Sequence, residues 1–317
     1  MISVIVPCKN RIDKLTLCIN SIYEALNYTF GDDKDNYEII IVNDHSDLGF
    51  REAVLKIFPE LIIIDSDGIG PGYARNYGIK NSKGKYIFFT DSDCVVSKEW
   101  ISEGIRILDE SGALVVQGVP WLFQKNENVY MGEQEEKLYK TMFSTYLYDD
   151  NRTKMTDSRN LLLNRDITKV LGEEVFSEKM AKATAESRVF GTRCLNNNIE
   201  IIFDLDLKIY HEDSKDIESV CRQKYRHGSG RIEIWEETPS FDYLEERYFT
   251  NPIKYGNDVD YILPSHFGFL LGYFQTLGDK EKYSNFIKFA EEVFKKYDKK
   301  ISDYKILNEM IDEYGNK

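Results

Sequence analysis

Long apolar runs are missing from this chain of 317 residues. No window reaches the roughly 18 uninterrupted apolar residues that predict a membrane-spanning helix. The best candidate, 262–277, is broken by proline, glycine and polar residues, as in a core helix. The N-terminus shows neither the charged leader nor the apolar centre of a signal peptide. We therefore expect a cytoplasmic protein, either free or in peripheral contact with the inner face of the membrane.

Paired cysteines and an excess of positive charge are missing too. The five cysteines are scattered and form no C-x-x-C pair, which favours free thiols over a zinc site or a disulfide framework. The formal net charge is −13, the opposite of the basic footprint of a general nucleic-acid binder. A ligand that carries phosphate would therefore need a local device, either a metal ion or a few well-placed arginines.

Two nucleotide-binding signatures are also absent. The chain has no G-x-x-x-x-G-K-[ST] sequence, which excludes a P-loop. The glycines of 68–72 do not fit the dinucleotide pattern G-x-G-x-x-G, because Tyr73 stands where that pattern requires glycine. The chain also lacks internal repeats and low-complexity tracts.

Apolar patterning alternates between strand and helix along most of the chain. Short apolar runs predict buried strands, whereas apolar residues spaced three and four apart predict amphipathic helices. The predicted strands are 2–6, 37–42, 61–64, 86–89, 113–119, 157–164, 199–203 and 207–210. The predicted helices are 12–26, 48–58, 73–81, 97–110, 181–196 and 216–227, with a helix and a loop in 124–150. This alternation predicts an α/β fold with a doubly wound, mostly parallel sheet.

The composition changes near residue 236. Apolar and aromatic residues then recur at helical spacing over 267–297, and core packing is the expected role of such residues. We therefore predict an α/β domain over 1–235 and a C-terminal α-helical region over 236–317.

The most informative stretch is 85–94, KYIFFTDSDC, a predicted buried strand that ends in Asp91 and Asp93. Right-handed crossovers bring the carboxyl ends of parallel strands to one sheet edge, so we expect 7–11 and Asp44 beside these aspartates. In extended backbone the two carboxylates would face one side and could share a divalent cation that carries phosphate oxygens. A turn with a helix cap is the alternative, since aspartate suits both positions.

Three segments together resemble a known family. VIVPCKNR, YEIIIVNDHS and GPGYARNYGIKNSKGKYIFFTDSDC occur in this order. They resemble the GT-A glycosyltransferases of the large inverting family that includes cellulose and chitin synthases. The resemblance covers roughly residues 1–120 and continues more weakly to about 230. It implies transfer of a sugar from a nucleoside diphosphate to an acceptor hydroxyl, with inversion and usually with Mn²⁺ or Mg²⁺.

The resemblance also implies roles for single residues. Those expected to contact the nucleotide-sugar are Pro7, Asn10, Arg11, Asp44, Arg75, Asp91, Arg222 and Arg226, and those expected to bind the metal are Asp91, Asp93 and His211. Simpler interpretations remain open: a turn aspartate at Asp44, a surface ion pair at Arg75, a packed histidine at His211 and a solvated helix face at 222–226.

The sequence departs from the family at the position of the catalytic base. The family has Glu-Asp at the start of a helix, with the aspartate as base, whereas this chain has Glu186 followed by Ser187. Serine cannot act as that base, so we expect Glu186 to take the role. The alternative is that Glu186 is a solvent-facing helix charge.

Three functional hypotheses follow. The first is a metal-dependent inverting glycosyltransferase that uses a nucleotide-sugar, with UDP favoured. Its acceptor would be a glycan, a lipid-linked molecule or a small molecule in surface glycan synthesis. The second is a sugar-nucleotide-binding or scaffold subunit that has lost its base at Ser187. The third, a nucleotidyltransferase, is disfavoured because VPCKNR lacks the glycine-rich loop that such enzymes carry after the first strand.

Overall fold

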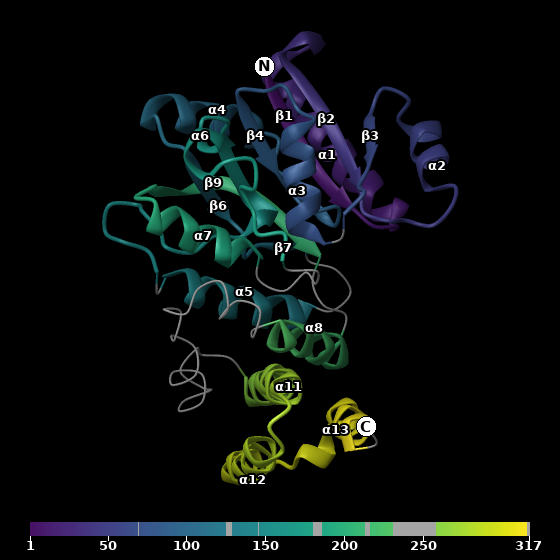
Figure 1. Cartoon of the computed structure of the whole chain (residues 1–317), viewed down its shortest axis with the longest axis vertical. Coiled ribbons are helices and arrows are strands. Elements are labelled where there is room, and N and C mark those ends of the chain that lie inside the picture. Colours follow the sequence, from purple (N-terminus) through teal and green to yellow (C-terminus); the bar gives the residue numbers. More distant parts are fainter. Residues whose placement is uncertain are drawn as a thin grey trace. The chain divides into compact units, whose positions relative to one another are not determined.

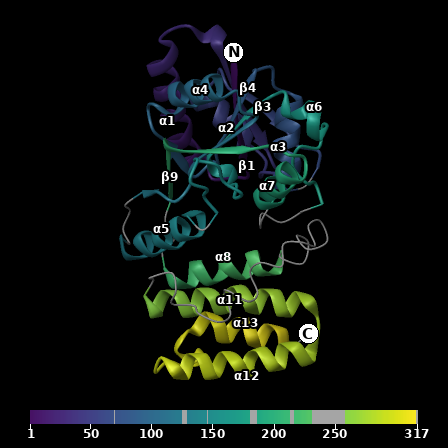
Figure 2. The ribbon, with the colours of Figure 1, turned by 90° about the vertical axis from the view of Figure 1, so that its left-hand side faces the viewer.

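The chain forms two compact units (Figures 1 and 2) in a computed structural model that describes residues 1–68, 70–124, 129–144, 146–179, 186–212, 216–230 and 258–315. The first unit comprises 1–124, 142–181 and 186–212, and the second comprises 125–141, 182–185 and 213–317. The predicted domain boundary at 235 lies outside the described residues, so it stays a prediction.

The first unit is built on a curled sheet of nine strands. Their order is β3–β2–β1–β4–β8–β6–β9–β5, and β7 pairs with β9. The strands are β1 (Ile2–Cys8), β2 (Tyr37–Asn43), β3 (Ile62–Asp65), β4 (Tyr86–Phe89), β5 (Cys94–Val96), β6 (Val115–Val119), β7 (Phe123–Gln124), β8 (Leu161–Asn164) and β9 (Ile201–Glu212). The strands β3, β2, β1 and β4 are mutually parallel, whereas β8 runs antiparallel to β4 and β6. The predicted mostly parallel α/β fold is therefore confirmed.

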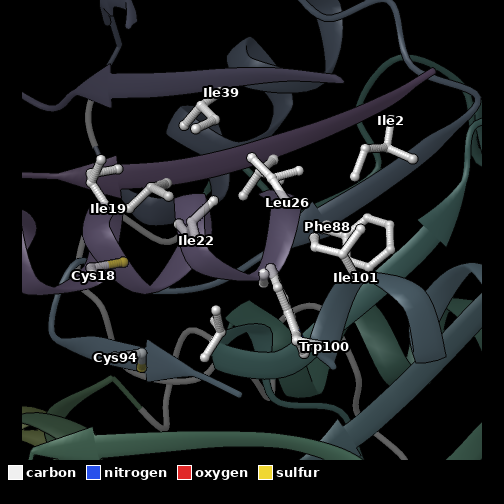
Figure 3. Packing of buried hydrophobic residues seen from close by; sticks show 14 of the residues in the cluster. Ile2, Cys18, Ile19, Ile22, Leu26, Ile39, Phe88, Cys94, Trp100 and Ile101 are labelled. Atoms are coloured by element: carbon white, nitrogen blue, oxygen red, sulfur yellow. The ribbon is translucent and has the colours of Figure 1, made fainter. Parts of the chain in front are cut away.

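Helices cover both faces of this sheet. They are α1 (Ile12–Phe30), α2 (Phe50–Ile57), α3 (Pro71–Lys80), α4 (Trp100–Ser111), α6 (Ile167–Leu171) and α7 (Glu186–Asn196). Successive residues of a strand point to opposite faces. Accordingly, Val4 packs in the cluster that contains α1 and α4, whereas Ile5 packs in the cluster that contains α3 and α7. Figure 3 shows the first cluster, in which side chains of α1 meet Phe88 and Trp100.

Two sequence-based element predictions need correction. The predicted strands 199–203 and 207–210 are one strand, β9, whose first part pairs with β6 and whose last part pairs with β5 and β7. One long strand can pair first with β6 and then with β5 and β7 because the register of the β6–β9 pairing shifts between Gln117 and Val119 of β6. The predicted strand 157–164 begins with the short turn Ser158–Asn160, and only Leu161–Asn164 is extended.

The second unit is helical in its described part, as the sequence predicts for the C-terminal region. It contains α8 (Ile217–Ser229), α11 (Val259–Leu277), α12 (Lys280–Lys296), α13 (Lys305–Gly315) and most of α5 (Val129–Ser144). The helices α8 and α11 lie side by side (Figure 2). Within the described ranges, none of the helices has the length and apolar character needed to cross a bilayer.

Glycines set the close approach of α8 and α11. A methyl group added at Gly272 would overlap the backbone carbonyl of Tyr225, and one at Gly228 would overlap that of Phe269. We expect Gly272→Ala to destabilise the protein by about 1–3 kcal/mol, since backbone cannot yield as a side chain can. Chemical denaturation measures the effect. A methyl group added at Gly268 would lie 3.0 Å from its nearest neighbour, the carbonyl oxygen of Cys221. We therefore expect Gly268→Ala to lower the free energy of unfolding by less than Gly272→Ala. Equal stability of the two variants would contradict this account of the packing.

A buried histidine makes the second unit sensitive to acid. Burial lowers the pKa of His266 to about 4, although the carbonyl of Ile262 lies 3.2 Å from its Nδ1. Between about pH 6.5 and pH 4 the unfolded chain therefore binds a proton that the native state does not. The free energy of unfolding should fall across this window, by about 2 kcal/mol at pH 5.

Thermal or chemical denaturation at pH 7 and pH 5 tests this prediction. The variant His266→Gln keeps a polar side chain but does not titrate, so it should lose less stability between the two pH values. A loss as large as that of the wild type would contradict the assignment to His266.

Candidate active site

The loops after β1 and β2 are joined at the carboxyl edge of the sheet. Asn10 and Arg11 both adopt left-handed backbone conformations, with φ of 59° each. The backbone N–H of Asn10 donates to Ser46 Oγ at 2.7 Å, and the N–H of Asp47 donates to Asn10 Oδ1 at 2.9 Å. These bonds hold Asp44 near the end of β1, with its own N–H bonded to the carbonyl of Cys8 at 2.8 Å.

The two aspartates after β4 lie in a turn. The N–H of Cys94 donates to the carbonyl of Asp91 at 3.0 Å, which closes a tight turn between β4 and β5. The expectation of extended backbone over 91–93 is therefore wrong. Because the chain turns, Asp91 and Asp93 contact different partners instead of sharing one side.

Asp93 faces a histidine and an arginine. Its Oδ1 lies 3.5 Å from His211 Nε2, and its Oδ2 accepts a hydrogen bond from Arg11 Nη1 at 2.8 Å. The antiparallel pairing of β5 with β9 places His211 directly opposite Cys94. Burial alone would raise the pKa of Asp93, but His211, Arg11 and Arg159 hold it below its usual range. The carboxylate is therefore kept in its charged form.

The atoms around Asp93 fit a divalent metal ion. The ligand atoms of Asp93, Cys94 and His211 all lie within 4.8 Å of one another. Two ligands about 2.1 Å from one ion in octahedral geometry are about 3 Å apart, close to the Asp93–His211 distance. A carboxylate and an imidazole suit Mn²⁺. Cys94 is fully buried in the apolar cluster of Figure 3, and its pKa is raised by burial, so it is a poor ligand for a hard cation.

Asp91 belongs to a second group, in which an arginine bridges two carboxylates. Arg75 Nη2 donates to Asp91 Oδ1 at 2.9 Å, and Arg75 Nη1 donates to Glu186 Oε1 at 2.8 Å. Arg75 is only 2% exposed, so the surface ion pair that the sequence left open does not describe it. Among the described residues, Asp91 does not join the group of Asp93 and His211.

Glu186 is the first residue of α7 and is buried rather than solvent-facing. Burial raises its pKa, and the charge of Asp91 adds to this, while Arg75 opposes both. The positive end of the α7 dipole also favours a carboxylate at this position. Glu186 is thus a buried carboxylate with an elevated pKa, a condition that general bases in active sites often show.

Arg222 and Arg226 lie on α8 in the second unit. The Arg222 guanidinium is 3.6 Å from Glu309 Oε2 on α13, and its side chain is 57% exposed. The predicted contact of these arginines with the nucleotide-sugar stays a prediction, as does that of Pro7, which lies within β1 opposite Val42.

Sequence reasoning missed one charged pair beside Asp93. Arg159 Nε and Nη2 donate to the two carboxylate oxygens of Asp157, at 2.9 and 2.7 Å. The charge of Arg159 lowers the pKa of Asp93, and His211 helps to lower that of Asp157. The apolar content of 157–164 predicts a strand for this segment. The Asp-x-Arg spacing before the apolar run was the only signal in the sequence.

Known proteins that are similar to this chain are glycosyltransferases. A model of Glycosyl transferase family 2 matches residues 3–172, more than half of the chain. The glycosyltransferase AglE of Haloferax volcanii is 22% identical over 240 residues, which are 74% of this chain and 74% of that protein. The uncharacterized glycosyltransferase RC0461 of Rickettsia conorii is 36% identical over 112 residues, 35% of this chain but only 17% of that protein.

One solved structure has a similar fold along nearly the whole chain. It is the mannosyltransferase PcManGT from Pyrobaculum calidifontis, in complex with GDP-Man and Mn²⁺. The TM-score is 0.56 at 15% identity, with 99% of this chain and 84% of the other covered. The fold is therefore of the GT-A type, as the sequence predicts. With the family match, it follows that this chain belongs to glycosyl transferase family 2 and is a glycosyltransferase.

Proposed function

We propose that this protein transfers a sugar from a nucleoside diphosphate-sugar to an acceptor hydroxyl, with a divalent metal ion and with inversion at the anomeric carbon. The observation that carries the proposal is that the two aspartates of the turn after β4 each belong to a cluster of charged or titratable side chains. One is Asp93 with His211, and the other is Asp91 with Arg75 and Glu186.

Asp93 and His211 would hold the metal ion in this proposal. A bound Mn²⁺ or Mg²⁺ supplies positive charge where the leaving diphosphate gains negative charge. Arg11 would assist, because its side chain is 56% exposed and is already directed toward Asp93. Pro7, Asn10 and Asp44 border the joined β1 and β2 loops and would contact the nucleotide.

Glu186 would take the proton of the acceptor hydroxyl. Its carboxylate is buried, its pKa is raised by burial, and only one of its oxygens is bonded to Arg75. A base whose pKa is closer to the working pH removes a proton more effectively. Ser187 could not do this. Inversion follows if the acceptor attacks from the side opposite to the leaving diphosphate.

UDP-sugars are the donors that we favour, and GDP-sugars are the first alternative, since the PcManGT structure contains GDP-Man. We propose an acceptor hydroxyl on a glycan, a lipid-linked molecule or a small molecule of surface glycan synthesis.

A panel of UDP- and GDP-sugars with Mn²⁺ tests the proposal, with release of nucleoside diphosphate as the readout. NMR of the product's anomeric proton reports inversion or retention. We expect release with at least one donor, and loss of release after chelation of the metal. Binding of a nucleotide-sugar without any turnover would instead favour a subunit that has lost its base at Ser187. Absence of both would overturn the proposal.

A further inference from the structure

We propose that His45 selects the base of the donor nucleotide, because its imidazole occupies one of the two oxygens of the Asp44 carboxylate. The base that fits is uracil, which directs a single N–H at a carboxylate, rather than guanine, which directs two. His45 is then a specificity-determining residue that acts through Asp44. This inference rests on the proposed use of a nucleoside diphosphate-sugar, and it chooses between UDP-sugars and GDP-sugars.

The backbone at His45 has an uncommon conformation. It lies in the left-handed region, with φ of 58°, which disfavours most residues that have a Cβ atom. The loop imposes this conformation from both sides. The N–H of Ser46 donates to Asn43 Oδ1 at 3.1 Å, and Asn10 is bonded to both Ser46 and Asp47. Glycine would fit the same position with less strain, so the fold alone does not require an imidazole here.

The imidazole lies against the carboxylate of the preceding residue. His45 Nδ1 is 3.2 Å from Asp44 Oδ1. An ionised carboxylate can only accept hydrogen bonds, so Nδ1 carries the proton and donates it. Within the part of the chain that the structure describes, this is the one hydrogen bond that the Asp44 side chain accepts, and the side chain is 21% exposed. A ligand can therefore reach Oδ2, while Oδ1 is occupied by His45.

Asp44 lies where the base of a bound nucleotide would be. In the sheet, β1 separates β2, which precedes Asp44, from β4, which precedes the candidate metal ligand Asp93. Neighbouring strands are about 4.8 Å apart, so the ends of β2 and β4 are about 10 Å apart. A diphosphate bound at Asp93 would then place its ribose near β1 and its base near the loop after β2. A carboxylate at that place repels phosphate but accepts an N–H from a base.

Uracil and guanine differ in the N–H groups that they offer to a carboxylate. Uracil has one ring N–H between two carbonyl oxygens, so a single acceptor oxygen satisfies it. Guanine has a ring N–H beside an amino group, and this pair matches a carboxylate with both oxygens open. When Oδ1 of Asp44 is bonded to His45, one of these two donors is poorly satisfied, which weakens binding. We therefore expect UDP to bind about tenfold more tightly than GDP.

Calorimetric titration of the full chain with UDP and with GDP tests the inference, in the presence of Mn²⁺ and at about pH 8, where an unperturbed imidazole is uncharged. In His45→Gly both oxygens of Asp44 are open to a ligand. The tenfold preference should therefore fall to about threefold or less, mainly because GDP binds more tightly. In His45→Asn the amide nitrogen can replace Nδ1 as the donor, and asparagine tolerates the left-handed backbone, so the preference for UDP should remain. A wild type that binds GDP as tightly as UDP would overturn the inference.

The control is Asp47→Asn. Asp47 is exposed in the same loop, and its backbone N–H, rather than its carboxylate, is bonded to Asn10. Its ratio of Kd values should match that of the wild type. The double variant Asp44→Ala with His45→Gly should have the same ratio as Asp44→Ala alone, because His45 acts through the carboxylate. A further change of the ratio in the double variant would show that His45 contacts the base itself, which would overturn the inference.

NMR of the imidazole nitrogens gives a readout that needs no nucleotide. The signals of His45 are identified by their loss in His45→Asn. They should show the proton on Nδ1 in the wild type, and Asp44→Ala should remove this preference. A proton on Nε2 in the wild type would contradict the proposed hydrogen bond.

The titrations also separate this inference from the proposed function. If at least one nucleotide binds but His45→Gly leaves the ratio of Kd values unchanged, His45 does not select the base, and the proposed function stands. If neither nucleotide binds, both are overturned.

Discussion

Replacement of Asp93 by alanine is expected to abolish measurable sugar transfer, with kcat lowered by about 10²- to 10³-fold or more. The change removes the carboxylate that lies 3.5 Å from His211 and leaves Arg11 without its partner. We expect the nucleoside diphosphate to lose its metal-dependent binding as well. Steady-state assays over a range of Mn²⁺ concentrations measure both effects.

A matched control for this variant is Asp206→Ala. Asp206 lies on β9 in the same unit, but its side chain is 76% exposed and contacts only the nearby Lys208 among its described ion-pair partners. We expect the kcat of Asp206→Ala and its dependence on Mn²⁺ to match those of the wild type. Chelation of the metal should abolish sugar transfer by the wild type and by Asp206→Ala alike, and added Mn²⁺ should restore the activity of both. If Asp93→Ala kept wild-type activity and metal response, the assignment of the metal to Asp93 and His211 would be wrong.

Replacement of Glu186 by glutamine is expected to lower kcat by about 10²- to 10⁴-fold, the range for loss of a general base. The amide oxygen can still accept the hydrogen bond from Arg75, so the geometry and the KM for the donor should change little. Burial raises the pKa of Glu186, so the wild type should lose activity on the acid side at a pH above the ordinary glutamate value of about 4.3.

The control for Glu186→Gln is Glu52→Gln, which changes another first-turn glutamate. Glu52 is exposed at the start of α2 and is not part of either group on the turn. Its replacement should leave kcat and its pH dependence unchanged. Retention of wild-type kcat by Glu186→Gln would remove this residue from the mechanism and would reopen the question of which group accepts the proton.

Much of the fold could be predicted because the apolar runs in the sequence correspond to buried strands of the sheet. The runs at 2–6, 37–42 and 86–89 are mostly apolar, with Ser3 and Glu38 as the exceptions, and most residues of their strands are buried, so pattern and burial agree. The residues at the ends of β1, β2 and β4 could be grouped in advance, since parallel strands bring their carboxyl ends together.

The less predictable features depend on tertiary contacts. Asp-Ser-Asp is compatible with both a strand and a turn, and only pairing of β5 with β9 decides for the turn. Arg75 looks like any helix arginine in the sequence. Its burial arises because Asp91 and Glu186, which lies 111 positions further along, meet around it. The family resemblance pointed to Arg75, Asp91 and Asp93, but it could not assign the two aspartates to different groups of side chains.

The most direct test of the account is calorimetric titration of the wild-type protein with UDP and with GDP, in the presence and absence of Mn²⁺. We predict that at least one of the two nucleotides binds with Mn²⁺ and that its affinity drops sharply without the metal or in Asp93→Ala. Binding that is equally tight without metal and in Asp93→Ala would contradict a metal site at Asp93 and His211. Absence of binding by either nucleotide would contradict the donor class itself.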